Sequence, residues 1–186
     1  MPENFKKVPD NWNLVFDSEA IRRSIFRISY EIIEKHPDLQ NIAIVGIKTA
    51  GEFIARRIQE RIKEIEGKEL PFGSIDISLY RDDLVHEDND PTLNATELPF
   101  KVAKTKIILV DDVLYSGRTI RAALDALTDF GRPKSVQLAV LADRGHREFP
   151  IRADFVGKNL PTHNREFVRV RLKEMNYEDG VYLISK

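Results

Sequence analysis

Three short runs of apolar residues constrain the fold of this 186-residue chain more than any other feature. They lie at 42–46, 107–110 and 136–142 and read IAIVG, IILV and VQLAVLA. Strands that are apolar along nearly their whole length, without alternating polar residues, are typical of a parallel sheet covered on both faces. The sequence therefore predicts an α/β fold, with a mostly parallel sheet flanked by helices.

Segments with helical periodicity separate these runs. The first helix begins after the N-cap candidate Asp17 and ends before Pro37. Second and third helices are predicted over 51–67 and 118–129. Along the first helix, apolar residues recur at spacings of four, three and four, which places them on one face: Ile21, Ile25, Ile28 and Ile32.

The remaining strands are shorter. Ile75, Ile77 and Leu79 alternate with polar residues, which indicates a strand with one wetter face. Three further strands are expected in the last third of the chain, near 153–157, 167–172 and 181–184.

The segment 81–100 is acidic, contains two prolines and has no apolar period. Loops of this length in compact domains are often functional, so we expect a long functional loop here. The polar N-terminus is expected to form an arm over residues 1–16, and residues 17–186 a single domain.

Composition excludes several classes of protein. The 29 basic and 30 acidic residues nearly cancel, which excludes a globally basic nucleic-acid binder. Without cysteine the chain has no disulfide framework and no thiolate metal site, and it suits a reducing cytoplasm. No stretch approaches the roughly 20 apolar residues of a membrane-spanning helix, so no membrane partner is expected. The histidines show no metal-ligand spacing, so no metal ligand is assigned to a side chain.

The segment that carries chemistry is 107–119, IILVDDVLYSGRT. A buried strand ends in Asp111 and Asp112, and a loop then presents Ser116 and Gly117 at the start of a helix. Ligands of α/β folds bind at strand ends, and helix N-termini bind phosphate. Two carboxylates suit ribose hydroxyls or a magnesium-bound water shell.

Two familiar phosphate motifs are absent, because the chain has neither GxxxxGK[ST] nor GxGxxG. Two acids followed by Ser-Gly fit an ordinary strand–loop–helix equally well, whereas the complete thirteen-residue pattern is far more specific.

That pattern resembles the phosphoribosyl-pyrophosphate (PRPP) motif of type I phosphoribosyltransferases. Within that superfamily the chain is similar, over 17–186, to the bifunctional pyrimidine operon attenuation protein / uracil phosphoribosyltransferase family. The similarity rests on VDDVLYSGRTIRAALDAL, GRPKSVQLAVLADRGHREFPIRADFVGKNLPT, VGIKTAG and DISLYRDD. It implies the type I phosphoribosyltransferase fold, with a flexible loop at about 81–100 and a small C-terminal hood at about 144–165.

The resemblance also implies a reaction, in which uracil and PRPP give UMP and pyrophosphate with Mg²⁺. Asp111 and Asp112 would hold the ribose hydroxyls, and Arg81 would reach over the pyrophosphate. Many purine relatives place an acid where this chain has Tyr115, so no general base is assigned.

The implied ligand contacts fall into three groups. The pyrophosphate loop is Lys48, Thr49, Ala50 and Gly51. The rest of the PRPP and UMP site is Asp111, Asp112, Val113, Leu114, Tyr115, Ser116, Gly117, Arg118 and Thr119. The uracil candidates are Arg144, Val156, Lys158 and Leu160.

Members of the family also bind the leader mRNA of pyrimidine genes when UMP is high, which terminates transcription. The candidate RNA residues here are Arg23, Phe26, Arg27, Tyr30, Arg152 and Thr162. Phe26 and Tyr30 stand where a Thr and a His are expected, and Ala50 stands where an Arg is usual. The two aromatic residues fit stacking on RNA bases, or alternatively a contact between copies of the chain.

Three alternatives to the bifunctional protein follow. The chain could be a salvage enzyme that does not bind RNA, an RNA-binding UMP sensor with little catalysis, or a phosphoribosyltransferase for another base such as a purine. Asp111, Asp112 and the phosphate loop are intact, which favours an active enzyme. The segment GKNLPT favours a pyrimidine by resemblance. A homodimer or higher homo-oligomer is expected.

Overall fold

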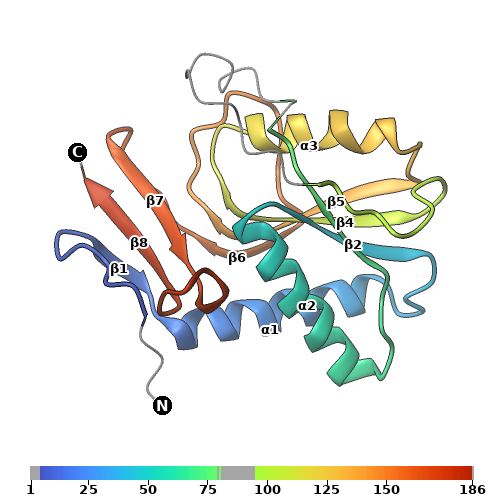
Figure 1. Cartoon of the computed structure of the whole chain (residues 1–186), viewed down its shortest axis with the longest axis horizontal. Helices are drawn as coiled ribbons and strands as arrows, with labels where there is room; N and C mark the ends of the chain where they lie inside the picture. The colour runs from blue at the N-terminus through green and yellow to red at the C-terminus, as the bar shows by residue number, and fades with distance from the viewer. Residues whose placement is uncertain (1–4, 79, 81–94, 186) are drawn as a thin grey trace.

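A computed structural model describes residues 5–78, 80 and 95–185 of the chain. Within these residues, helices and strands alternate before a run of strands closes the chain (Figure 1). In order, the elements are β1 (Asn13–Phe16), α1 (Ser18–Lys35), β2 (Ile42–Ile47), α2 (Ala50–Glu66), β3 (Phe72–Ile75), β4 (Lys106–Leu114), α3 (Arg118–Asp129), β5 (Ser135–Asp143), β6 (Phe155–Asn159), β7 (Glu166–Arg171), the 3₁₀ helix η1 (Lys173–Met175) and β8 (Gly180–Ser185).

The main sheet has the strand order β3-β2-β4-β5-β6, and all its strands are parallel. Helices α1 and α2 cover one face and α3 covers the other (Figure 1). After β2 the chain forms β3 on one side of that strand, and it then forms β4 on the other side. The gap between β2 and β4 is therefore the topological switch point, where α/β sheets bind ligands.

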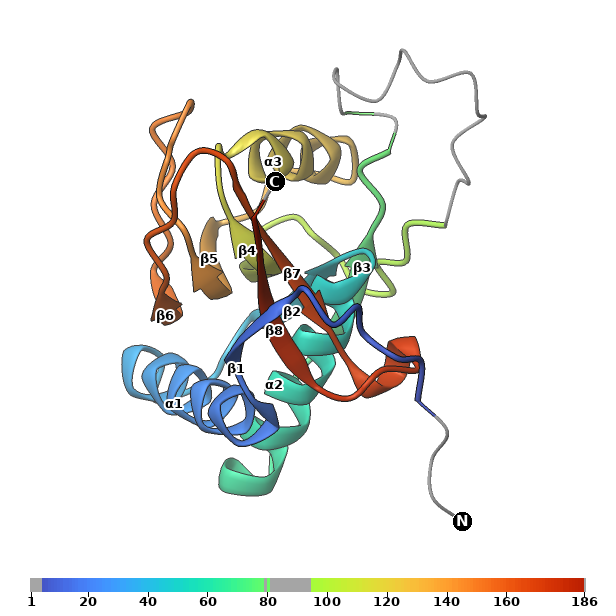
Figure 2. The same ribbon diagram turned by 90° about the vertical axis from the view of Figure 1, so that its left-hand side faces the viewer.

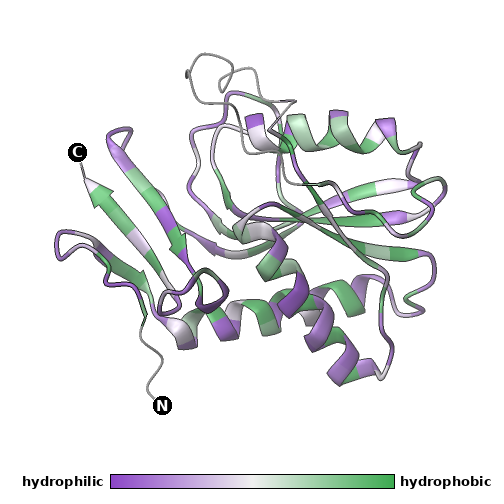
Figure 3. Ribbon diagram, in the orientation of Figure 1, coloured by the Kyte–Doolittle hydropathy of each residue, from purple (hydrophilic) through white to green (hydrophobic). Residues whose placement is uncertain are grey.

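The core lies on both sides of this sheet, as the apolar runs predict. Every residue of β2 is buried, and Figure 3 shows apolar residues along the strands and polar residues on the outer helix faces. Ile21, Ile28 and Ile54 pack on the α1–α2 side. Ile107 and Leu109 point to the α3 side, so successive residues of β4 serve opposite faces.

Local signals define the helix ends. The Asp17 carboxylate accepts a hydrogen bond from Ala20 N at 2.7 Å, which confirms the predicted N-cap of α1. The helix ends at Lys35, two residues before Pro37. Gly67 ends α2 in a left-handed conformation, with φ 65°.

A second, antiparallel sheet has the order β1-β8-β7 (Figure 2). It differs from the boundaries expected from the sequence in two ways. The expected arm includes β1, which pairs with β8 and whose last residue, Phe16, is buried in the core with 1% exposure. The expected hood at 144–165 includes β6, which is an edge strand of the parallel sheet.

The strand predicted at Ile75–Leu79 was wrong in position, because β3 lies at Phe72–Ile75. Pairing of β2 with β3 ends at Ile47↔Ile75, so the next residues have no strand beside them. Ser78 instead donates its N–H to the Asp76 carboxylate at 2.8 Å, which forms a turn. Leu79 lies outside the described residues.

Most of the expected long loop, 81–94, also lies outside the described residues, and Arg81 with it. Its last part, from residue 95, returns to the sheet, because Glu97 exchanges two backbone hydrogen bonds of 2.8 Å with Ser74. None of the helices in the described ranges is long and apolar enough to cross a membrane.

Candidate active site

The two predicted carboxylates lie inside β4, at the point where its neighbour ends. Pairing between β2 and β4 stops at Gly46↔Val110, whereas pairing with β5 continues through Asp111↔Val140. From Asp111 onward, one edge of β4 therefore faces the switch point. This register brings the carboxylates to the ligand-binding edge of the sheet.

Both side chains are oriented by the backbone. An oxygen of Asp111 accepts from Asp112 N at 2.9 Å, and an oxygen of Asp112 accepts from Val113 N at 2.8 Å. Burial raises the pKa of Asp112 above its ordinary value, although hydrogen bonds and the nearby charge of Arg169 oppose the rise. A partner that carries positive charge or donates hydrogen bonds would stabilise the ionised form.

The loop between β2 and α2 lies against these acids. A Cβ atom on Gly51 would lie 2.7 Å from Val110 O and 3.0 Å from the Cα of Asp111, so only glycine fits there. The Lys48–Thr49 peptide bond is cis. The close approach at Gly51 places the N-terminus of α2, with its unpaired N–H groups, next to β4.

The loop from β4 to α3 forms a second turn at the same edge. Gly117, with φ 93°, is the N-cap of α3. Ser116 is buried, and its carbonyl accepts hydrogen bonds from Glu148 N and Phe149 N. The Arg118 guanidinium pairs with Glu148. A hollow of about 370 Å³ follows this turn, lined by Asp111, Val113, Leu114, Tyr115, Ser116, Gly117, Arg118, Thr119, Ile120 and Glu148.

A cavity of about 520 Å³ joins the two loops. Eight residues predicted from the sequence line it: Lys48, Thr49, Ala50, Asp111, Asp112, Val113, Tyr115 and Arg144. The structure thus brings together the predicted pyrophosphate loop, the acids and one uracil candidate.

Six further lining residues were missed by the sequence reasoning: Phe167, Val168, Arg169, Val170, Arg171 and Met175. Five of them belong to β7, whose sequence EFVRVR alternates two arginines with the half-buried Val168 and the buried Val170. That alternation is the signal that could have indicated a strand with one charged face directed away from the core.

Arg144 closes one end of the cavity. Its guanidinium donates to Thr162 Oγ1 at 3.0 Å and to Glu166 O at 2.8 Å, and it stacks 4.0 Å from the ring centroid of Tyr115. Burial lowers the pKa of Arg144, but a guanidinium stays charged in proteins. It therefore presents a fixed, buried cation beside the tyrosine ring.

The other three uracil candidates do not line this cavity. Val156 and Lys158 lie on β6, and the Lys158 Nζ lies 4.6 Å from the centroid of the Phe16 ring. Leu160 follows β6 and donates its N–H to Asp143 O. Their role toward a base stays a prediction.

The RNA candidates divide between two places. Arg23, Phe26, Arg27 and Tyr30 are exposed on α1, and the Phe26 and Tyr30 rings lie 4.8 Å apart. Arg27 also donates to the carbonyl of Gly157 on β6. In the described part of the chain, no hydrogen bond or ion pair joins Arg152 or Thr162 to α1.

Comparison with known proteins identifies the group to which this geometry belongs. A family model described as "Phosphoribosyl transferase domain" matches residues 11–175. The chain belongs to this family. "Bifunctional protein PyrR" of Listeria monocytogenes serotype 4b (strain CLIP80459) is 54% identical over 176 residues, which cover 93% of this chain and 96% of the relative. "Bifunctional protein PyrR" of Bacillus cereus (strain B4264) is 53% identical over 175 residues, covering 93% and 97%.

Solved phosphoribosyltransferases share the fold. A hypoxanthine-guanine phosphoribosyltransferase of Bacillus anthracis has a TM-score of 0.69 at 17% identity, covering 92% of this chain and 97% of that chain. A Trypanosoma cruzi hypoxanthine phosphoribosyl transferase has a TM-score of 0.72 at 16% identity, covering 96% and 94%. These similarities confirm the predicted fold, and the matches to bifunctional relatives confirm the resemblance seen in the motifs. The chain is a phosphoribosyltransferase, for which PRPP and a base are the substrates.

Proposed function

We propose that this phosphoribosyltransferase converts uracil and PRPP to UMP and diphosphate, and that it also regulates pyrimidine genes by binding leader mRNA when UMP is bound. One observation carries the catalytic part. The cavity at the switch point joins two carboxylates, the loop before α2 and a buried arginine in one space. These groups match the ribose, the diphosphate and the polar edge of a base.

Asp111 and Asp112 accept hydrogen bonds from the 2′ and 3′ hydroxyls of the ribose in this proposal. The β4 backbone fixes both carboxylates, so the sugar is oriented before reaction. The 5′-phosphate binds in the hollow at the start of α3, where Ser116 and Thr119 supply hydroxyls and the helix supplies N–H groups.

Phosphoribosyltransferases generally use Mg²⁺ with PRPP, and the residues here fit such an ion. No cluster of three or more candidate metal ligands exists among the described residues, so those residues do not form a complete cage. Mg²⁺ commonly binds one or two carboxylates and completes its shell with water and substrate phosphates. Asp111 and Asp112 are the residues that would hold it, and the ion would neutralise charge on the diphosphate.

The bond that breaks joins the anomeric carbon to the diphosphate, and the transition state resembles an oxocarbenium ion. Lys48 and the N-terminus of α2 stabilise the charge that develops on the leaving group. The Lys48 ammonium donates to Ala95 O at 2.7 Å, which holds it at the rim of the cavity. No covalent nucleophile is required.

The base binds at the Arg144 end of the cavity. Tyr115 places a ring, rather than a carboxylate, beside that space. A carbonyl-rich pyrimidine suits the cationic edge of Arg144 better than a base that must exchange a proton with an acid. Uracil, hypoxanthine and guanine assayed side by side test this preference, and faster turnover of a purine would contradict it.

The central test replaces both acids, as Asp111→Asn together with Asp112→Asn. We expect loss of UMP formation with an unchanged circular-dichroism spectrum, because asparagine keeps the shape but loses the charge. Asp125→Asn, on the outer surface of α3, is the control and should retain activity. Near-normal turnover by the double variant would refute the assigned ribose site.

The regulatory part is supported by the exposed aromatic pair on α1. Phe26 and Tyr30 are 38% and 46% exposed, and the Arg61 guanidinium lies 5.2 Å from the Phe26 ring centroid. Aromatic rings flanked by arginines bind the splayed bases of RNA loops. The proposal also includes a homo-oligomer in the cytoplasm.

Titration with a hairpin from the cognate pyrimidine leader, with and without UMP, tests this surface. Phe26→Ser with Tyr30→Ser should weaken binding at least tenfold while UMP synthesis continues. Phe130→Ser changes an equally exposed aromatic residue elsewhere and serves as the control. If the double variant instead changes only the sedimentation behaviour, the pair is a contact between copies of the chain.

A further inference from the structure

The Arg171 side chain is the most unusual polar group in the cavity. Its Nε is buried and has no hydrogen-bond partner within the described residues. No hydrogen bond or ion pair of its remaining nitrogens occurs there either. A buried donor without an acceptor is costly, so such a group in a binding cavity indicates a ligand that satisfies it.

Aromatic rings hold this guanidinium in place. Its central carbon lies 5.2 Å from the centroid of Trp12 and 4.6 Å from that of Tyr177. Trp12 in turn packs against Tyr182, with ring centroids 5.9 Å apart. Stacking fixes the plane of a guanidinium while leaving its N–H edge available for a bidentate anion.

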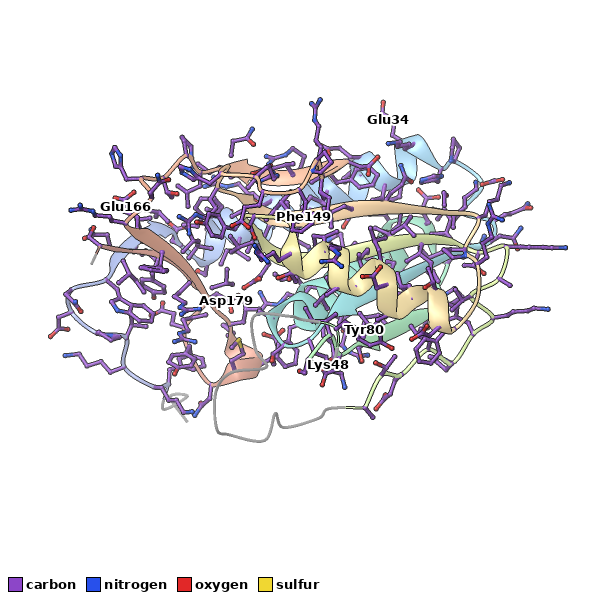
Figure 4. All side chains as sticks on the ribbon, turned by 90° about the horizontal axis from the view of Figure 1, so that it is seen from above. Glu34, Lys48, Tyr80, Phe149, Glu166 and Asp179 are labelled. Carbon is purple, nitrogen blue, oxygen red and sulfur yellow. The ribbon has the colours of Figure 1, made fainter. Side chains whose placement is uncertain are left out.

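The position of Arg171 along β7 indicates which part of the substrate it meets. The strand begins at Glu166, whose carbonyl accepts from Arg144 at the base end of the cavity. It ends next to η1, where Glu174 pairs with Arg57 of α2 at 2.6 Å. Figure 4 shows Glu166 at one end of β7, with Asp179 and Lys48 toward the other. Arg171 therefore lies on the side of α2, about 13 Å along the strand from Phe167.

That side of the cavity is where the leaving group is expected. The loop Lys48–Ala50 and the N-terminus of α2 line it, together with Met175. Four cations line the whole cavity against two acids: Lys48, Arg144, Arg169 and Arg171 against Asp111 and Asp112. The excess of positive charge suits a substrate with a polyanionic leaving group.

We propose that Arg171 binds the diphosphate group of PRPP from the β7 side, opposite the loop before α2. This inference rests on the proposed function, because it assigns a residue to the same reaction. The diphosphate accepts two hydrogen bonds from the guanidinium edge, and the Trp12–Tyr177 stack keeps that edge in position. The leaving group is then held by two elements that belong to different sheets.

The chain carries its own reporter for this contact, because Trp12 is its only tryptophan. Titration of the whole protein with diphosphate and Mg²⁺ should change Trp12 emission in a saturable manner, since the stacked guanidinium acquires an anionic partner. An emission that does not respond while calorimetry shows diphosphate binding would overturn the proposal.

Calorimetry of variants separates a ligand contact from a structural role. Arg171→Gln should raise the Kd of PRPP and of diphosphate about tenfold or more, because it removes a charge-assisted bidentate contact. The Kd of UMP, which has no diphosphate, should change less than twofold. Arg171→Lys keeps the charge but lacks the paired N–H groups of the guanidinium. Its Kd for diphosphate should lie between those of the wild type and of Arg171→Gln. Arg165→Gln, on an exposed arginine just before β7, is the matched control.

Each result of these measurements assigns or refutes the role of Arg171 in diphosphate binding. Equal weakening of UMP and diphosphate would mean that Arg171 only supports the fold, and an unchanged Kd for diphosphate would mean that it makes no contact. If the glutamine variant does not fold, the lysine variant gives the same comparison. Failure of the proposed function would give a result distinct from failure of the Arg171 assignment. In that case the wild-type protein would bind PRPP and diphosphate but make no UMP from uracil.

Discussion

Gly51 is the residue at which the sequence most directly decides the shape of the site. It lies where α2 begins, and its Cα faces Val110 O and Asp111 across a gap too narrow for a methyl group. The close approach brings the N-terminus of α2 to the carboxylates. The absence of a side chain at position 51 therefore sets the distance between the N-terminus of α2 and the carboxylates of β4.

Gly51→Ala should lower kcat/KM for UMP formation at least tenfold, because the added Cβ would lie 2.7 Å from Val110 O and must displace α2. Gly67→Ala is the matched control. It introduces strain of about 1 kcal/mol at φ 65° but meets no atom within 4 Å. Steady-state kinetics and thermal melts should show lost activity in the first variant, and only a lower Tm in the second. Equal activity in both would contradict this account of Gly51.

At the scale of elements, an ion-pair cluster ties the second sheet to the first. Arg57 on α2 donates to Glu174 of η1 and to Asp179 just before β8, at distances of 2.6–2.9 Å. Burial alone would raise the pKa of Asp179, but hydrogen bonds from Arg57 and Lys173 N outweigh it and lower that pKa. The ionised form of Asp179 is therefore part of the fold.

Asp179→Asn should lower the free energy of unfolding by about 3 kcal/mol at neutral pH, because it leaves Arg57 without one buried partner. A depressed carboxyl pKa gives stability that is present above the unfolded value and lost as the pH falls through the folded value. Wild type should therefore lose the contribution of the Asp179 charge as the pH falls below about 4, whereas the variant lacks that contribution throughout. Urea unfolding at several pH values measures the difference. Glu178→Gln, an exposed neighbour, should show neither effect.

The elements that were predictable from the sequence are those fixed by nearby residues. Asp17 and Gly67 define helix ends, and the apolar runs at 42–46 and 107–110 become buried parallel strands. The position of β3 was not predictable, because it depends on where its neighbour β2 ends. A periodic pattern shows that a strand can form, but it does not show with which strand it pairs.

The residues of the candidate site also fall into those that were predictable from the sequence and those that were not. Asp111 and the turn at Gly117 occur in one continuous segment, so their proximity follows from the local chain. Arg171 reaches the same cavity only because β7 pairs with β8 and lies across the end of β4. The alternation within β7 indicates a charged strand face, but no local pattern shows which part of the molecule that face meets.

For the molecule as a whole, the cavity lies between two sheets. Its walls come from β4 and the loop before α2 on one side and from β7 on the other. A ligand that binds both walls adds a connection that the empty protein lacks. Ligand binding and the stability of the whole fold are therefore linked.

PRPP with Mg²⁺ at about 100 times its Kd should stabilise the fold by about 2.7 kcal/mol. For a chain of this size that corresponds to a rise in Tm of about 5–10 °C. Differential scanning fluorimetry measures the shift. The variant with Asp111→Asn and Asp112→Asn should show a much smaller rise at the same concentration. An equal rise in both would place the binding elsewhere.

The pairing of β1 with β8 also has a consequence for the order in which the fold assembles. All strands of the parallel sheet lie between β1 and β8 in the chain, so that sheet can form before the two strands meet. Pairing β1 with β8 closes a much longer loop, and contacts between distant segments form slowly. The parallel sheet can thus be in place while the β7 side of the substrate cavity is still open. Competence for catalysis arrives only when these distant segments join.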